Sequence, residues 1–361
     1  MGASTIVSDA AARFITRIVG GRVRRKVDGT IQAAAQAARS LALVALSLFS
    51  LCAGPAAAQT WPDRPLTLVV PFAAGGGTDL LARIVAKRLS EVLGQQVVVE
   101  NVGGAGGMIG SAKVVKSPPD GYTMVVGTTA DAINQSLYKN PLYDFSADLV
   151  PAGLMGSQPT VLLGRKDLPA NTLQEFTAYV KANAANVKVG SAGVGSTGHL
   201  FCQMLQAVLG INGVTHVPYR GGGPAMQDLI AGRYDYICTL GPSGKQLIEG
   251  DSVKGIAILQ PKRSPEIPNL PSTAEQGLSD FEVSTWFGLF FPKGTPEPII
   301  RKLNAALGET LDTPWVQQRF KDIVATVARP EERSPEYLKK LSESEITKMA
   351  DAIRAAGIEK F

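Results

Sequence analysis

The sequence predicts an α/β fold with two lobes joined by crossing strands and a ligand between the lobes. Short apolar segments alternate with amphipathic helical segments, as they do in parallel sheets. Glycine-rich turns lead from strands into helices early in the chain and again in its middle. The chain beyond residue 298 is helical, which predicts that the tail returns to the first lobe.

The first strand–turn–helix unit carries the strongest signal. Residues 66–70 form the apolar run of a strand buried on both faces. The glycines at 75–77 allow close approach of the backbone to a ligand, and Thr78 or Asp79 is expected to cap the following helix. A helix N-terminus behind such a turn presents free N–H groups, so this unit is a candidate anion site.

Later elements follow from the same signals of apolar period and breaker residues. Further strands are expected at 96–101, 122–127, 161–163, 188–190, 215–217, 234–239, 255–259 and 282–291. Further helices are expected within 103–117 and at 172–182, 199–209, 226–231, 298–311, 314–321 and 335–356.

The N-terminus has the layout of a secretory signal peptide over residues 1–58. Seven basic residues precede a short apolar run at 41–53, and an Ala-x-Ala site predicts cleavage after Ala58 and export of the chain. Because this leader holds seven basic and two acidic residues, the remaining chain has 29 of each and is formally neutral. A neutral chain argues against nucleic-acid binding.

Cysteine and histidine are sparse after the leader. Cys202 and Cys238 fall in a helical and a buried strand pattern, and we favour two free thiols over the disulfide that an oxidising compartment would permit. His199 and His216 do not fall in ligand spacing with the cysteines, so no metal site is expected.

The middle glycine turn matches a dinucleotide fingerprint, G-x-G-x-x-G, at residues 193–198. The acidic residue expected about twenty positions later is missing, and an exported chain has little access to nicotinamide cofactors, so we expect no cofactor. The pattern G-x-S-x-G is absent around Ser196, and we expect no catalytic residue. A small-anion turn that uses the hydroxyls of Ser191, Ser196 and Thr197 is favoured.

Two other positions have alternative interpretations. Asp131 follows Thr128 and Thr129 at a strand end, where α/β sheets bind ligands, although a solvated loop residue is the favoured interpretation. Phe72 precedes the first glycine turn and either stacks on a ligand or packs on the sheet.

Several ordered motifs resemble the solute receptors of tripartite tricarboxylate transporters, the Bug family, over residues 61 to about 357. They include WPDRPLTLVVPFAAGGGTDLLAR, VVVENVGGAGGMIG, VGSAGVGSTGHL, HVPYRGGGPAMQDLIAGR and WFGLFFPKGTPEPIIRKLN. The resemblance implies a type II, Venus-flytrap periplasmic binding protein in which each lobe is a mixed sheet flanked by helices. It implies lobe 1 at 59–162 plus 283–361 and lobe 2 at 163–282.

The resemblance also implies a function and a site. The ligand would be a small organic acid or related carboxylate or amide, the partners would be the transporter's membrane subunits, and the receptor would be a monomer and not an enzyme. An exported hydrolase or dehydrogenase is the alternative. Relatives often carry an acid where Thr239 stands, and many lack one at Asp131. The expected ligand-binding residues are Phe72, Ala73, Gly76, Gly77, Thr78, Asp79, Thr128, Thr129, Asp131, Ser191, Gly193, Ser196, Thr197, Gly198, His199, Tyr219 and Thr239.

Overall fold

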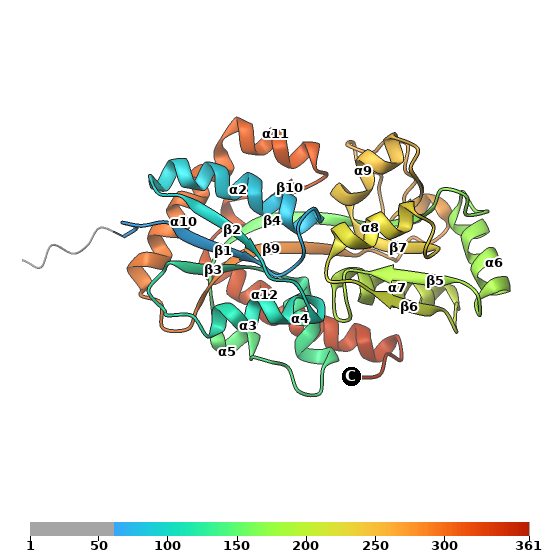
Figure 1. The fold of residues 1–361 in the computed structure, drawn as a ribbon, viewed down its shortest axis with the longest axis horizontal. Coiled ribbons are helices and arrows are strands. Elements are labelled where there is room, and N and C mark those ends of the chain that lie inside the picture. The colour runs from blue at the N-terminus through green and yellow to red at the C-terminus, as the bar shows by residue number, and fades with distance from the viewer. Residues whose placement is uncertain (1–60, 361) are drawn as a thin grey trace, which may run out of the picture. The chain divides into compact units, whose positions relative to one another are not determined.

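The strands of the protein form one continuous sheet (Figure 1). The computed structural model describes residues 61–360, and the predicted leader with its cleavage site lies outside them. The strands are β1 (Leu66–Val70), β2 (Val97–Asn101), β3 (Thr123–Thr128), β4 (Leu149–Arg165), β5 (Lys188–Ser191), β6 (Thr215–Pro218), β7 (Tyr236–Leu240), β8 (Val253–Ile258), β9 (Ser284–Pro292) and β10 (Thr326–Val327).

Helices follow most of the strands and cover the sheet. They are α2 (Gly77–Leu93), α3 (Met108–Val115), α4 (Thr129–Leu137), α5 (Phe145–Asp148), α6 (Leu173–Asn183), α7 (Thr197–Leu209), α8 (Gly222–Ile230), α9 (Gly241–Glu249), α10 (Glu297–Asp312), α11 (Pro314–Asp322) and α12 (Pro335–Ala355). Three short 3-10 helices are η1 (Ala105–Gly107), η2 (Ala274–Gln276) and η3 (Pro330–Glu332). Within residues 61–360, no helix is long and apolar enough to cross a membrane.

The strand order β2-β1-β3-β9-β4-β7-β5-β6 divides the sheet into two lobes. Strands β2, β1 and β3 are parallel in the first lobe, and β7, β5 and β6 are parallel in the second. The antiparallel pair β4 and β9 joins these sets, and β8 and β10 also pair with β4. The predicted two-lobed α/β fold is therefore confirmed.

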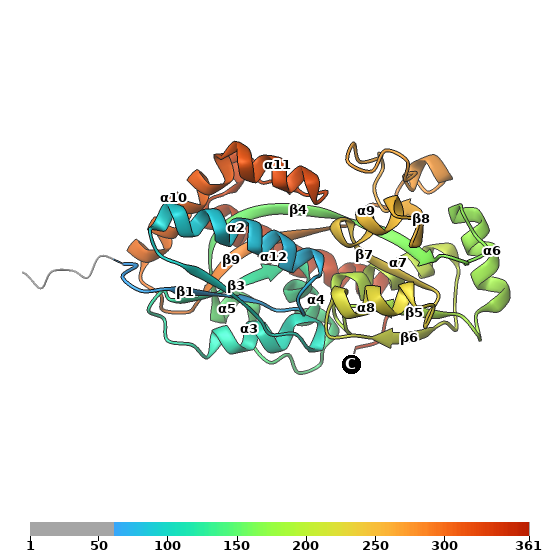
Figure 2. The same cartoon turned by 45° about the horizontal axis from the view of Figure 1, so that its top comes forward.

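Strand β4 extends from the lobe that contains α2 into the lobe that contains α9 (Figure 2). Only its segment 161–163 is predicted from the sequence, because Pro151, Gly153, Gly156 and Pro159 interrupt the apolar pattern. Pro151, Gly153 and Gly156 lie where the register with β9 shifts, between 151 and 153 and again between 154 and 156. Pro159 pairs with Ser284 at the start of β9.

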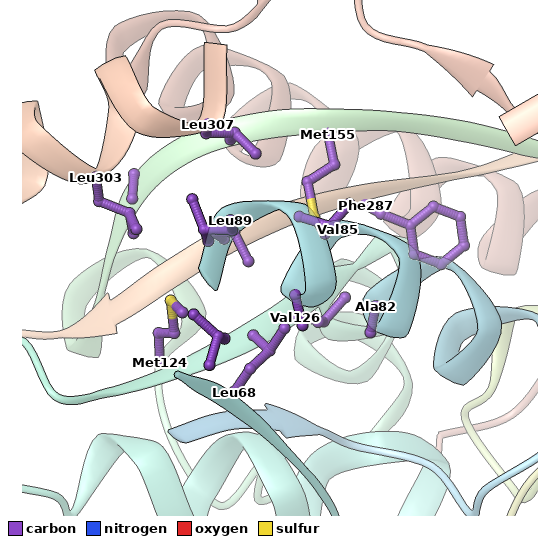
Figure 3. Close-up of a cluster of buried hydrophobic side chains, with 14 of the residues drawn as sticks. Leu68, Ala82, Val85, Leu89, Met124, Val126, Met155, Phe287, Leu303 and Leu307 are labelled. Carbon is purple, nitrogen blue, oxygen red and sulfur yellow. The ribbon is translucent and has the colours of Figure 1, made fainter. Parts of the chain in front are cut away.

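Helix α2 is fixed on the first lobe by a core between the sheet and the C-terminal helices (Figure 3). Fully burying one such side chain contributes roughly 1.5–3 kcal/mol. The core contains Leu68, Val85, Leu89, Met124, Val126, Met155, Phe287, Leu303 and Leu307. Since α2 is anchored along its length, its N-terminus is held at the carboxyl end of β1.

The helical tail returns to the first lobe only in part. Leu303 and Phe320 of α10 and α11 belong to the first-lobe core, as predicted. Helix α12 begins beside β9, where Leu338 is buried, but Met349 and Ile353 near its end pack in the cluster that contains Leu200. Helix α12 therefore contributes to the cores of both lobes.

Candidate functional site

The carboxyl ends of several strands and the turns or helix starts that follow them surround one cavity. Its empty space, part of which is open solvent and not enclosed by the protein, amounts to about 520 Å³. It is lined by Phe72, Gly76, Gly77, Thr78, Thr128, Thr160, Ala192, Ser196, Thr197, Gly198, Gly222, Cys238, Thr239, Leu240, Ser243 and Thr285. These residues follow β1, β5, β6 and β7, or lie on β3, β4, β7 and β9.

Five helices begin at this cavity. Each of α2, α4, α7, α8 and α9 contributes its N-cap or its first residue to the lining, namely Gly76, Thr128, Ser196, Gly222 and Leu240. A helix N-terminus carries free N–H groups and a partial positive charge, and none of the lining side chains is charged. The helix N-termini therefore favour an anion in the cavity, although α2 and α4 each carry an aspartate in their first turn.

The first glycine loop is fastened by the carboxylate of Asp79. It accepts hydrogen bonds from Gly75 N at 3.0 Å, Arg83 Nε at 3.0 Å and Asn101 Nδ2 at 2.9 Å. Burial opposes ionisation, but these hydrogen bonds and the charge of Arg83 together lower the pKa of Asp79 below its ordinary value. The predicted caps at Thr78 and Asp79 are wrong, because the helix begins earlier, with Gly76 as its N-cap.

We expect Asp79→Ala to lower the free energy of unfolding by about 1.5–3 kcal/mol, because it removes a buried charged acceptor from three donors. Arg83→Ala is the matched control, since its half-exposed ion pair contributes only about 0–1 kcal/mol. Urea denaturation measures both values. Equal losses in the two variants would contradict the anchoring role of Asp79.

The second glycine loop is ordered by hydroxyl and imidazole groups. Ser191 Oγ accepts a hydrogen bond from Gly193 N at 3.0 Å and lies 2.7 Å from His216 Nε2. Ser196 Oγ caps α7 by accepting from His199 N at 3.3 Å. His199 Nδ1 accepts from Gly195 N at 3.4 Å, and the two imidazole rings lie 4.3 Å apart.

These two histidines make the protein sensitive to mild acid. Burial, together with the charge of His216, lowers the pKa of His199 to about 3, and burial lowers that of His216 to about 4. Below pH 6.5 the unfolded chain binds protons that the folded protein does not, so stability is lost as pH falls from 6.5 toward 4. The midpoint temperature of thermal unfolding should fall from pH 7 to 6 to 5. In the His216→Gln variant this midpoint should fall less steeply over the same range. A midpoint that does not change over this range would contradict the prediction.

Nine of the expected ligand-binding residues line the cavity, namely Phe72, Gly76, Gly77, Thr78, Thr128, Ser196, Thr197, Gly198 and Thr239. The other eight lie outside the lining, namely Ala73, Asp79, Thr129, Asp131, Ser191, Gly193, His199 and Tyr219. Several of these support the lining from behind. Thr129 Oγ1 accepts from Trp286 N on β9, and Tyr219 Oη donates to Asp228 on α8.

Asp131 is neither a cleft residue nor a solvated loop residue. It is only 2% exposed, within the first turn of α4. Ser111 Oγ donates to its carboxylate at 2.7 Å, Thr128 N donates at 2.8 Å, and the hydroxyl of Tyr143 donates as well. Burial raises the pKa of Asp131, although these hydrogen bonds oppose the rise. Its carboxylate closes the capping box that orients Thr128 toward the cavity.

The expectation of two free thiols is wrong. Cys202 on α7 and Cys238 on β7 form a disulfide, with their Cα atoms 5.4 Å apart. Helix α7 packs closely against this strand, since a Cβ on Gly198 would lie 2.3 Å from Cys238 O. The helical and strand patterns of the two cysteines gave no sign that they face each other.

Seven further residues line the cavity that the sequence did not indicate: Thr160, Ala192, Gly222, Cys238, Leu240, Ser243 and Thr285. One signal was available for Thr160. Gln158 and Thr160 are polar at alternate positions of β4, which places them on one face of the strand.

The sequence profile described as "Tripartite tricarboxylate transporter family receptor" matches residues 81–358. A protein of Agrobacterium vitis, named "UPF0065 protein in the TAR-I ttuE-ttuC' intergenic region", is 40% identical over 301 residues, covering 83% of this chain and 87% of the relative. The chain therefore belongs to the tripartite tricarboxylate transporter receptor family.

Solved structures agree with this assignment. The periplasmic binding protein BugD matches with a TM-score of 0.80 and 39% identity, over 83% of this chain and 100% of BugD. MatC from Rhodopseudomonas palustris, solved with bound malate, matches with a TM-score of 0.78 and 38% identity, over 81% of this chain and 100% of MatC. The expected Bug-type receptor is confirmed, and the class of protein is a periplasmic solute-binding receptor.

Proposed function

We propose that this protein captures one small organic acid between its lobes in the periplasm and presents it to the membrane subunits of a tripartite tricarboxylate-type transporter. The main support for this proposal is that five helix N-termini converge on a cavity whose lining side chains are uncharged. Such a cavity suits a carboxylate, which accepts several N–H hydrogen bonds at once. The malate bound to MatC supports the same ligand class.

In this proposal the ligand carboxylate contacts Gly76–Thr78 at the start of α2 and Ser196–Gly198 at the start of α7. The lobes divide near residues 162 and 283, where β4 and β9 cross, and they close on the ligand as a monomer. A ligand stabilises the closed form only by binding it more tightly than the open form. Cleavage of the leader after Ala58 would accompany this export.

The expected behaviour is binding without turnover. Calorimetry with a panel of organic acids should give one site per chain. A ligand at one hundred times its dissociation constant should add about 2.7 kcal/mol to the free energy of unfolding. NMR of the ligand after long incubation should show it unchanged. Product that forms in proportion to protein concentration would overturn the receptor proposal in favour of an exported enzyme.

The Ser191–His216 pair is the feature that a hydrolase would need, and its geometry argues against catalysis. Ser191 is fully buried and lies outside the cavity lining. Its hydroxyl oxygen accepts a hydrogen bond from Gly193 N. A nucleophile must reach the substrate, so this pair is better suited to ordering the glycine loop.

A further inference from the structure

A polar patch lies on one face of the two crossing strands. Gln158 of β4 and Thr285 of β9 are direct cross-strand partners, and Thr160 lies two residues along β4 on the same face. The alternate residues Ser157, Pro159 and Ser284 line a separate groove. We call Gln158, Thr160 and Thr285 the floor patch, because Thr160 and Thr285 line the cavity.

The polar atoms of the floor patch are buried without partners. Gln158, Thr160 and Thr285 are 0%, 1% and 2% exposed. Among residues 61–360 no hydrogen-bond partner exists for either hydroxyl or for Gln158 Oε1 and Nε2. Folded proteins rarely bury such groups unpaired, and each one carries a desolvation cost. Their partners are therefore to be sought in what occupies the cavity.

Gln158 reaches the same region from beneath α2. A Cβ on Gly77 would lie 3.0 Å from Gln158 Oε1, so the amide is next to the helix N-terminus that lines the cavity. Because Gly77 has no side chain, the Gln158 amide can occupy this position. The floor patch thus lies next to Gly76–Thr78, where the ligand carboxylate is proposed to bind. Its Gln158 amide oxygen is an acceptor, and its amide and hydroxyl groups are donors.

The chemistry of the patch differs from that of the helix N-termini. A carboxylate only accepts hydrogen bonds and is served by N–H groups. The floor patch contains two hydroxyls and one amide, which both donate and accept, and no cation accompanies them. A ligand hydroxyl satisfies such a set, because it can donate to Gln158 Oε1 while accepting from a threonine.

We propose that the floor patch is a second recognition subsite, which selects organic acids that carry a hydroxyl group beside the bound carboxylate. This proposal rests on the proposed receptor function. Strands β4 and β9 run between the lobes, so the subsite belongs to the shared floor and not to one closing lobe. The hydroxyl is thereby recognised against a surface common to both lobes.

Three acid pairs that differ by one hydroxyl test the proposal: malate with succinate, lactate with propionate, and citrate with tricarballylate. Calorimetry should show that the protein prefers the hydroxylated member of any pair it binds by roughly 3- to 10-fold. In Thr160→Val/Thr285→Val the ratio should fall toward one, because only the contact with Gln158 remains. The affinity for the member without the hydroxyl should change less than about 3-fold.

Two controls separate a lost hydroxyl contact from a damaged fold. Thr160→Ser and Thr285→Ser retain the hydroxyl and should retain the preference. Thr310→Val removes another fully buried, unpartnered hydroxyl on α10 away from the cavity, and it should also retain the preference. If the double variant fails to fold, the preference of the parent protein within each acid pair still tests the subsite.

The outcomes distinguish this inference from the receptor proposal. Equal affinity within each bound pair, or an unchanged ratio in the double valine variant, would overturn the hydroxyl subsite while organic-acid binding stands. Binding only of acids outside the three pairs would also overturn it. If no organic acid binds at all, the receptor proposal fails and the subsite fails with it.

Discussion

Gly221→Ala is expected to lower the affinity for an organic acid about 10- to 100-fold, since overpacking costs about 1–3 kcal/mol and 1.4 kcal/mol is tenfold. Gly221 has φ 162°, an extended conformation that alanine adopts without strain. Its added Cβ would lie 2.6 Å from Ala73 N and 2.9 Å from Ala73 Cβ. Ala73 follows β1 in the first lobe and Gly221 follows β6 in the second, so the clash opposes the approach of the two loops.

The same contact contains a hydrogen bond between the lobes, which Ala73 N donates to Arg220 O at 3.1 Å. Gly308→Ala on α10 is the matched control, because a Cβ there meets nothing within 4 Å and should leave affinity unchanged. Calorimetry gives the affinities, and thermal unfolding without ligand should show both variants folded. Parental affinity in Gly221→Ala would mean that the bound state does not require this loop contact.

Elements with local signals could be predicted from the sequence. The first strand is expected at 66–70 and found at Leu66–Val70, and Gly94 ends α2 in the left-handed conformation that favours glycine. The glycine loops were found because positive-φ and close-approach positions select glycine, as at Gly75 and Gly193. Most of the cavity residues on α2 and α7 followed from those loops.

The floor of the cavity could not be predicted in this way. Gln158 and Thr285 become neighbours only through the pairing of β4 with β9, and prolines and glycines conceal the length of β4. Asp131 was misplaced for a related reason. Its partners Ser111 and Tyr143 come from other elements, and pairing at a distance leaves no mark in local periodicity.

A further prediction concerns the disulfide between Cys202 and Cys238. We expect Cys202→Ala/Cys238→Ala to lower the free energy of unfolding by about 2–4 kcal/mol, the range typical of a cross-link that closes a loop of a few tens of residues. The two cysteines are 36 residues apart in the sequence. Affinity should fall as well, because α7 supplies Ser196 and Gly198 to the cavity and β7 supplies Thr239.

A reductant separates the cross-link from the side chains. Reduction of the parent protein should lower the midpoint of urea unfolding toward that of the double variant, and the same reductant should leave the double variant unchanged. The alanines also remove buried volume beside Leu205 and Leu162, so the double variant should be somewhat less stable than the reduced parent. If reduction leaves the parent's stability and affinity unchanged, the cross-link does not set the position of α7, and packing of α7 on β7 through Gly198 must suffice.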